Sequence, residues 1–191
     1  MQHNIKGNWL DMKIGLVRHF RVKMKYPSRR KLISQNEVMD WFRKYDRSEI
    51  EEAKTDLQGI HWDKCYSSDL PRAAATARLI YKGPVLETEV LRELKLQPIF
   101  KKDVKLPFWL WPVIIRIAWY FNHKSQIKHK LESLERIRRF IDEMLTHKSE
   151  NILIVSHGAI MRYLRKELLK HGLKGPKFRM PLNGVLYIFD C

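Results

Sequence analysis

Short runs of apolar, β-branched residues alternate along the chain with longer segments whose apolar residues recur at helical spacing. Two of these runs, at 14–17 and 151–155, are almost continuously apolar. Such runs predict strands that are buried on both faces, as in a parallel sheet. Further strands are predicted near 63–67 and 85–87. The run at 184–190 predicts a final strand at an edge of the sheet.

Helices are predicted between these strands. Ser34 to Glu37 has the pattern of a capping box, and the next residues give one apolar helical face. That face is formed by Val38, Trp41, Phe42 and Tyr45. Other helices are expected at about 70–81, 125–147 and 158–172, and the acidic segment 48–58 is expected to be helical in part. Strands that alternate with helices predict an α/β fold, a three-layer α/β/α sandwich, with a single domain over 1–191.

The chain is strongly basic, which narrows the choice of partners. It has 191 residues, with 37 Lys and Arg against 21 Asp and Glu, so its formal net charge is +16. Such a charge favours anionic partners: phosphorylated substrates, acidic lipid or nucleic acid. A generically basic surface is the alternative. We expect no nucleic acid, because no recognition motif accompanies the charge.

Cysteine and histidine usage bounds the compartment and the cofactors. Cys65 and Cys191 form no disulfide framework, so a reducing compartment is expected. The first residues contain no apolar signal-peptide region. Both observations favour a cytoplasmic location. His123 and His129 have no partner ligands at a metal-binding spacing, so no metal site is expected.

Candidate chemistry lies where the predicted strands end. Arg18 and His19 follow the first strand, His157 follows the strand at 151–155, and Arg72 falls in the first turn of the helix at 70–81. Ligands of open parallel sheets bind at the carboxyl ends of the strands. Guanidinium groups bind a phosphoryl group through two hydrogen bonds, and an imidazole can attack it. These four residues therefore predict a site for phosphoryl chemistry.

Four motifs of the chain resemble those of the histidine phosphatase superfamily, in its phosphoglycerate-mutase-like branch. Arg18-His19-Phe20 matches the family's Arg-His-Gly except at the glycine. Ser68–Ala77 matches Ser-Asp-Leu-x-Arg-Ala-x-x-Thr-Ala at every specified position, and Leu91-Arg92-Glu93 matches Leu-x-Glu. Ser156-His157-Gly158 matches the closing Ser-His-Gly. The resemblance covers roughly residues 13–190, and it implies the same sandwich with an antiparallel last strand.

The resemblance also implies roles for single residues, without any cofactor. His19 would be the nucleophile, with Arg18, Arg72 and His157 as phosphate ligands. Glu93 would be the proton donor, because it alone fits the Leu-x-Glu motif. Glu87 and Glu89 are nearby rivals.

Two positions depart from the family's pattern. Phe20 replaces the motif glycine, and it is expected either to narrow the pocket, to stack on an apolar substrate or to reduce activity. Lys25 stands where many members carry an asparagine that helps to hold the phosphate. It either binds the same phosphate as a point charge or is a solvated lysine in a basic loop.

The segment Leu106–Phe121 is the least family-like part of the chain. Its only charged residue is Arg116, and lysines flank it on both sides. The segment is shorter than the roughly 20 apolar residues of a membrane-spanning helix. In the family an insertion here, at about 95–125, caps the active site. The alternatives are a dimer contact and a peripheral contact with acidic membrane, with Trp109, Trp111 and Trp119 in the headgroup region.

The leading hypothesis is a phosphatase that hydrolyses the phosphate monoester of a small molecule through a phosphohistidine. A phosphoglycerate-type mutase is the first alternative. A regulatory module that binds a phosphorylated ligand through a degenerate site is the second. The sequence does not identify the substrate or the oligomeric state.

Overall fold

The computed structural model describes residues 12–95, 97–146 and 150–191, and its centre is a five-stranded sheet. The strand order is β4 (Val85–Thr88), β3 (Lys64–Ser68), β6 (Ile152–Ser156), β1 (Ile14–Arg18) and β7 (Leu186–Phe189). Neighbouring strands are parallel except at one edge, where β7 runs antiparallel to β1. The predicted mostly parallel sheet with an antiparallel edge strand is confirmed.

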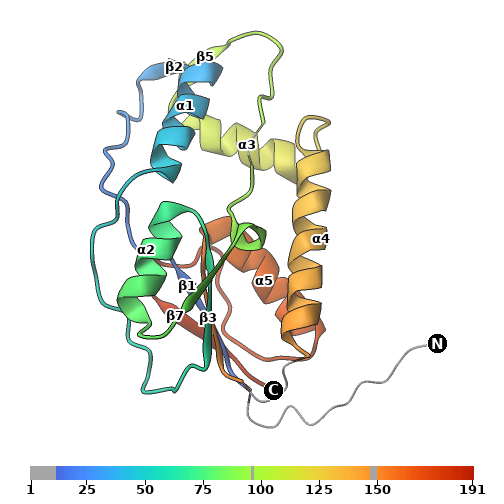
Figure 1. Ribbon diagram of the computed structural model, residues 1–191. Helices are drawn as coiled ribbons and strands as arrows, with labels where there is room; N and C mark the ends of the chain where they lie inside the picture. Colours follow the sequence, from blue (N-terminus) through green and yellow to red (C-terminus); the bar gives the residue numbers. More distant parts are fainter. Residues whose placement is uncertain (1–11, 96, 147–149) are drawn as a thin grey trace, which may run out of the picture.

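Helices cover both faces of this sheet and make it the middle of three layers (Figure 1). α2 (Pro71–Ile80) packs on one face, and α4 (Ile127–Met144) and α5 (Gly158–Lys170) pack on the other. β6 divides its side chains between the two layers. Ile152 and Ile154 pack with α4 and α5, whereas Leu153 and Val155 pack with α2. Because alternate side chains of a strand point to opposite faces, a strand that is apolar throughout has to be covered twice.

The helices predicted after Ser34 and at 70–81, 125–147 and 158–172 are present, with ends that differ from the prediction by a few residues. The predicted helix at 125–147 corresponds to α4, and its last predicted residue lies outside the described residues. Glu89–Leu91 adds a short 3-10 turn, η1, directly after β4.

The expectation of helix within 48–58 is wrong, because this segment forms no helix. Ile50 forms an antiparallel bridge with Val22 and is buried beside it. Further along, Thr55 donates a hydrogen bond from its hydroxyl to the Gly184 carbonyl at 2.8 Å. The segment lacks the apolar face that would pack a helix, and it is held instead by contacts of single residues, Ile50 and Thr55. The segment ends at Gln58, whose backbone has a left-handed conformation with φ of 56°.

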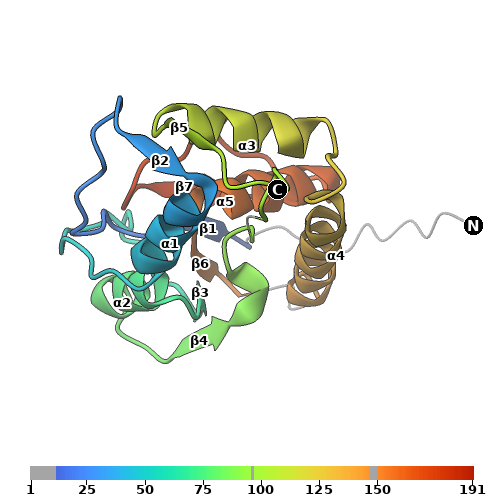
Figure 2. The same ribbon diagram turned by 90° about the horizontal axis from the view of Figure 1, so that it is seen from above.

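A smaller unit, which we call the cap, lies beyond the carboxyl ends of the strands (Figures 1 and 2). It consists of β2 (Leu32–Ser34), α1 (Gln35–Asp46), β5 (Lys105–Pro107) and α3 (Leu110–Tyr120), and β2 pairs antiparallel to β5. Its own core contains Ile33, Val38, Phe108 and Trp111. The apolar segment 106–121 thus supplies α3 and half of this core, and a segment far away in sequence, 32–46, supplies the rest.

The predicted capping box starts α1. The Ser34 hydroxyl accepts a hydrogen bond from the Glu37 amide at 3.2 Å, and the Glu37 carboxylate accepts one from the Ser34 amide at 2.6 Å. This reciprocal pair satisfies two backbone donors of the helix start and sets where α1 begins.

The tryptophans of 106–121 are not all available to a membrane. Trp111 is 1% exposed and donates from its indole Nε1 to the Ile33 carbonyl, and Trp119 is 8% exposed. Only Trp109, at 44%, is open to solvent. The expectation that all three lie in a headgroup region is therefore wrong, because the cap core holds Trp111 and the cavity side of α3 holds Trp119. Within the described residues, no helix has the length and apolar character needed to cross a bilayer.

Candidate active site

The register of the sheet brings the two motif histidines to the same edge. Arg18 on β1 lies opposite Ser156 on β6, and the His19 amide donates to the Ser156 carbonyl at 3.0 Å. The hydrogen-bonded pairing of β1 with β6 therefore continues for one residue beyond β1. His19 and His157 follow the two strands at the same edge of the sheet. Their ring centroids are 5.2 Å apart. The predicted convergence at the carboxyl end of the strands is present.

The His19 ring is held in one orientation and one tautomer. Its Nδ1 lies 2.6 Å from the Phe20 carbonyl oxygen, which can only accept, so Nδ1 carries the proton. The other nitrogen, Nε2, therefore has a lone pair, which faces the Arg72 Nε at 3.2 Å. Burial, followed by the positive charges of Arg72 and Arg18, lowers the pKa of His19 from 6.5 to about 3, against the opposing effect of the hydrogen bond to the Phe20 carbonyl. The ring is neutral at physiological pH, as a nucleophile requires.

Two residues that sequence reasoning did not single out hold the backbone around His19. The Phe20 amide donates to the Thr76 hydroxyl at 2.9 Å, and that hydroxyl donates to the Arg72 carbonyl at 2.7 Å. On the other side, the Asn183 side-chain amide donates to the His19 carbonyl at 2.6 Å. Thr76 lies inside the matched motif and was recognisable there. Asn183 gave no signal, because it approaches through the loop before β7.

Arg72 is a buried cation that α1 and α2 hold between them. It is 2% exposed, and its Nη1 lies 2.8 Å from the Asp46 carboxylate at the end of α1. Its guanidinium carbon stands 5.2 Å from the centroid of the Tyr45 ring. A carboxylate and an aromatic face both stabilise a guanidinium that has lost its water. Asp46 had no sequence signal, since only the packing of the cap against α2 brings it to the site.

His157 and Arg18 meet at the start of α5. His157 is fully buried, and its Nε2 lies 2.8 Å from the Ser68 hydroxyl oxygen. Burial, followed by the charge of Arg72, holds the pKa of His157 well below its usual value. Arg18 donates from Nη1 to the Pro181 carbonyl at 3.0 Å. Among the described residues, neither the His157 Nδ1 nor the buried Arg18 Nε has a hydrogen-bond partner.

The Arg18 guanidinium lies beside Gly158 at the start of α5, at a distance that a Cβ there would also allow. A Cβ at this position would lie 3.4 Å from the Arg18 guanidinium carbon and 3.1 Å from the Met180 sulfur. The guanidinium therefore lies close against the first residue of the helix. The free amides of a helix start and its dipole favour an anion at the same place.

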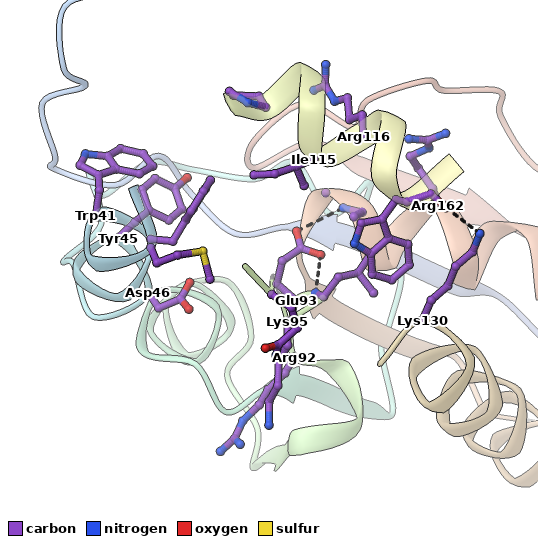
Figure 3. A pocket seen from close by; sticks show the side chains of 18 of the residues that line it. Trp41, Tyr45, Asp46, Arg92, Glu93, Lys95, Ile115, Arg116, Lys130 and Arg162 are labelled. Carbon is purple, nitrogen blue, oxygen red and sulfur yellow. Dashed lines mark hydrogen bonds between the residues drawn. The ribbon is translucent and has the colours of Figure 1, made fainter. Parts of the chain in front are cut away.

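Glu93 also belongs to this helix start, where it lines the cavity (Figure 3). Its carboxylate accepts hydrogen bonds from the amides of Ala159 at 3.2 Å and Ile160 at 3.3 Å. Burial raises the pKa of Glu93, although these amides and the charge of Arg72 act against it. The rivals lie elsewhere: Glu87 pairs with Arg78, and Glu89 is 74% exposed beside Arg92.

The site meets a cavity of about 1180 Å³, and among the described residues His19 and His157 are buried and do not themselves line it. Arg18, Arg72, Glu93 and Gly158 line the end next to the sheet. α1, α3 and α5 supply most of the remaining wall. In Figure 3, Glu93 lies centrally, with Tyr45 of α1 and Ile115 of α3 on different sides of it.

The two departures from the family pattern lie away from this cavity. Phe20 is 1% exposed and packs with Val22 and Ile50, so it neither narrows the pocket nor stacks on a substrate. It also keeps a negative φ, so this position does not require glycine. Lys25 is exposed and is not among the described residues that line the cavity, whereas its neighbour Tyr26 is.

Metal ligands do not cluster in the part of the chain that the structure describes: no three His, Cys, Asp or Glu side chains are placed to hold an ion together.

Comparison with known proteins identifies the class to which this fold and site belong. The model of the histidine phosphatase superfamily (branch 1) matches residues 43–191, which is most of the chain, so the chain belongs to this superfamily. The match begins after Arg18 and His19. The pairing of β1 with β6 places these two residues beside the matched motifs. No curated protein matches the chain.

Solved structures share the fold at low sequence identity. The α-ribazole phosphatase of Shigella flexneri is 19% identical with a TM-score of 0.54, over 93% of this chain and 89% of that one. A phosphoserine phosphatase of Entamoeba histolytica, in complex with 3-phosphoglyceric acid, is 16% identical with a TM-score of 0.51, over 95% and 98%. A phosphoglycerate mutase of Bacillus anthracis is 18% identical with a TM-score of 0.50, over 84% and 81%. The phosphoglycerate-mutase-like fold is therefore established, and a phosphatase-type enzyme is supported.

Proposed function

We propose that the protein is a phosphatase that hydrolyses phosphate monoesters through a phosphohistidine on His19. One observation carries this proposal: the hydrogen bond from Nδ1 to the Phe20 carbonyl leaves the lone pair of a neutral ring on Nε2, beside the Arg72 guanidinium. A purely structural histidine has no need of a nucleophilic nitrogen that faces buried positive charge. A degenerate binding module is disfavoured for the same reason.

The first step transfers the phosphoryl group to the enzyme. The Nε2 lone pair of His19 attacks phosphorus, and the bond from phosphorus to the ester oxygen breaks. Glu93 in its acid form protonates the departing alkoxide, so that a neutral alcohol leaves. Arg18 and Arg72 neutralise the charge on the phosphoryl oxygens, and the Phe20 carbonyl stabilises the ring as it becomes positive.

The second step reverses these roles with water. Glu93, now a carboxylate, takes a proton from water as the water oxygen attacks phosphorus. The phosphorus–nitrogen bond breaks and its electron pair returns to Nε2. A raised pKa suits Glu93 to both steps, because the group must be an acid first and a base afterwards.

His157 is proposed to donate to a phosphoryl oxygen from Nδ1. The Ser68 hydroxyl oxygen already accepts from the Leu70 amide, which favours donation of its own proton to the His157 Nε2. The proton of His157 is then on Nδ1, which has no partner among the described residues. Because Lys25 is not among the described residues that line the cavity, we propose it as a ligand only for a part of the substrate that extends outside the cavity.

A cytoplasmic location is proposed as well. Neither cysteine is in a disulfide: Cys65 is buried in β3, and Cys191 is exposed. Unpaired thiols are usual in reducing compartments.

Turnover of phenyl phosphate tests the proposed function. His19→Ala should abolish release of inorganic phosphate, whereas the matched change at a surface histidine, His171→Ala, should have little effect. Near-normal turnover in His19→Ala would contradict the mechanism. Transfer of the phosphoryl group to an added phosphoglycerate in preference to water would favour the mutase.

A further inference from the structure

Most of the cavity wall is apolar and has no role in the chemistry at the sheet end. Its members include Trp41, Tyr45, Phe108, Ile115, Trp119 and Tyr163, from the cap and from α5. The rings of Trp41 and Phe108 meet edge to face at 5.3 Å, and Tyr45 lies 5.3 Å from Trp41. These aromatic side chains form a continuous wall that starts beside Arg72. A substrate bound by its phosphate at the sheet end therefore directs its other end into apolar surroundings.

The cavity is also larger than a small metabolite needs. Its volume of about 1180 Å³ exceeds the roughly 300–1,000 Å³ of pockets that enclose drug-sized ligands. A three-carbon phosphate would leave most of the aromatic wall uncovered. Apolar surface that remains in contact with water adds nothing to binding, whereas an apolar group that covers it does.

The cavity opens on to the outer face of α3. Ile117, Tyr120 and Phe121 line the cavity and are also exposed, by 52%, 79% and 72%. Trp109 and Val113 are exposed on the same side of the helix, at spacings of four residues. Apolar side chains of α3 therefore both line the cavity and reach the molecular surface.

Basic residues are concentrated in and around α3. Residues 95–130 contain eight Lys and Arg, and Asp103 is their only acid. Arg116 of α3 and Arg162 of α5 are exposed and line the cavity together with Lys130 (Figure 3). An exposed apolar helix face within a basic surround is complementary to an anionic bilayer, which presents apolar chains below negative headgroups.

We propose that the substrate is the phosphate monoester of a long-chain lipid, which enters from an anionic bilayer surface in contact with α3. This inference rests on the proposed function, to which it adds the chemical class of the alcohol that leaves from the phosphate monoester. The phosphate binds at Arg18 and Arg72, and the chain lies along the aromatic wall between α1 and α3. Ile117, Tyr120 and Phe121 enter the headgroup region beside the opening.

A series of straight-chain alkyl phosphates tests the class of substrate. For the wild-type protein, kcat/KM should rise by up to about four-fold per added methylene until the cavity is filled. Ile115→Trp, which fills part of the wall, should move this plateau to shorter chains, and Ile115→Ala should not. A flat profile in a protein that turns over phenyl phosphate would overturn the lipid class and leave the proposed function standing. Failure with phenyl phosphate as well would instead count against the proposed function.

Vesicle sedimentation tests the source of the substrate. The protein should bind vesicles of phosphatidylcholine and phosphatidylserine at low salt, bind phosphatidylcholine alone weakly, and dissociate as salt is added. Ile117→Asp should weaken this binding at least ten-fold. Leu79→Asp, on α2 and of similar exposure at 50%, is the matched control and should not. Absence of binding, or equal loss in both variants, would overturn the bilayer as the source, even where long alkyl phosphates are good substrates.

Discussion

The two ends of the cavity differ in how their residues are held. At the sheet end, polar side chains are buried and fixed by backbone groups, as the His19 ring is by the Phe20 carbonyl. At the cap end, several apolar side chains are exposed, Tyr120 by 79% and Phe121 by 72%. Fixed polar groups suit chemistry, which needs preorganised geometry. Open apolar surface suits recognition of a chain that is itself flexible. We therefore assign reaction to the sheet end and selection to the cap.

Replacement of the acid at the sheet end is expected to have the largest effect. Glu93→Gln keeps the shape of the side chain and removes its proton, so turnover of alkyl phosphates should fall by about 10²–10⁴-fold. Aryl phosphates, whose leaving groups need less protonation, should lose less. In the wild type, activity on alkyl phosphates should decline as pH rises through the raised pKa of Glu93, and this limb should be absent from the variant. Equal losses on both substrate types would assign Glu93 to binding. Glu89→Gln is the exposed control.

A conservative change of the buried cation tests whether geometry, rather than charge, matters at the sheet end. Arg72→Lys keeps the charge but loses the Nε contact with His19 and the fork that holds a phosphoryl group. We expect kcat/KM for phenyl phosphate to fall by about 10²–10³-fold, as for loss of a preorganised donor elsewhere. Activity within a few-fold of wild type would show that a point charge is sufficient there.

A core change in the cap tests whether the two regions are separate. Trp111→Phe leaves the Ile33 carbonyl without its indole donor, at a cost of about 1–3 kcal/mol. Amide exchange in β2 and β5 should then accelerate by roughly five- to a hundred-fold, while exchange in β1 and β6 stays unchanged. Equal acceleration in both regions would show that cap and sheet open as one unit.

A separate expected effect concerns stability at low pH and involves no change in activity. Since the pKa of His19 is lowered from 6.5 to about 3, the unfolded chain binds one more proton at this residue between these values. His19 therefore contributes stability that is present above about pH 6.5 and is lost as pH falls toward 3. The free energy of unfolding of wild type minus that of His19→Gln should fall by up to about 1.4 kcal/mol per pH unit within this window. A difference that is independent of pH would contradict burial of a neutral ring. Urea unfolding at several pH values measures it.

The sequence predicted the sheet end better than the cap, for a physical reason. Strand periodicity and the motifs around Arg18, His19, Arg72 and His157 act locally, and the strand ends bring them together by topology alone. The course of 48–58 depends on isolated contacts, such as those of Ile50 with Val22 and of Thr55 with the Gly184 carbonyl, which no periodicity reveals.

The remaining site residues were hidden because distant segments supply them. Asp46 reaches Arg72 only through the packing of α1, and Asn183 reaches His19 only through the loop before β7. Phe20 was expected to affect the pocket, since a motif position suggests a role at the site. It belongs instead to a small core on the other side of the backbone.

The ring nitrogen that carries the phosphoryl group tests the central claim most directly. The adduct should be trapped by alkaline quench during turnover, located by mass spectrometry and resolved by nuclear magnetic resonance into its two positional isomers. Because Nδ1 is committed to the Phe20 carbonyl at 2.6 Å, we predict one phosphoryl group on Nε2 of His19. An adduct on Nδ1, an adduct on His157, or turnover without any adduct would contradict it.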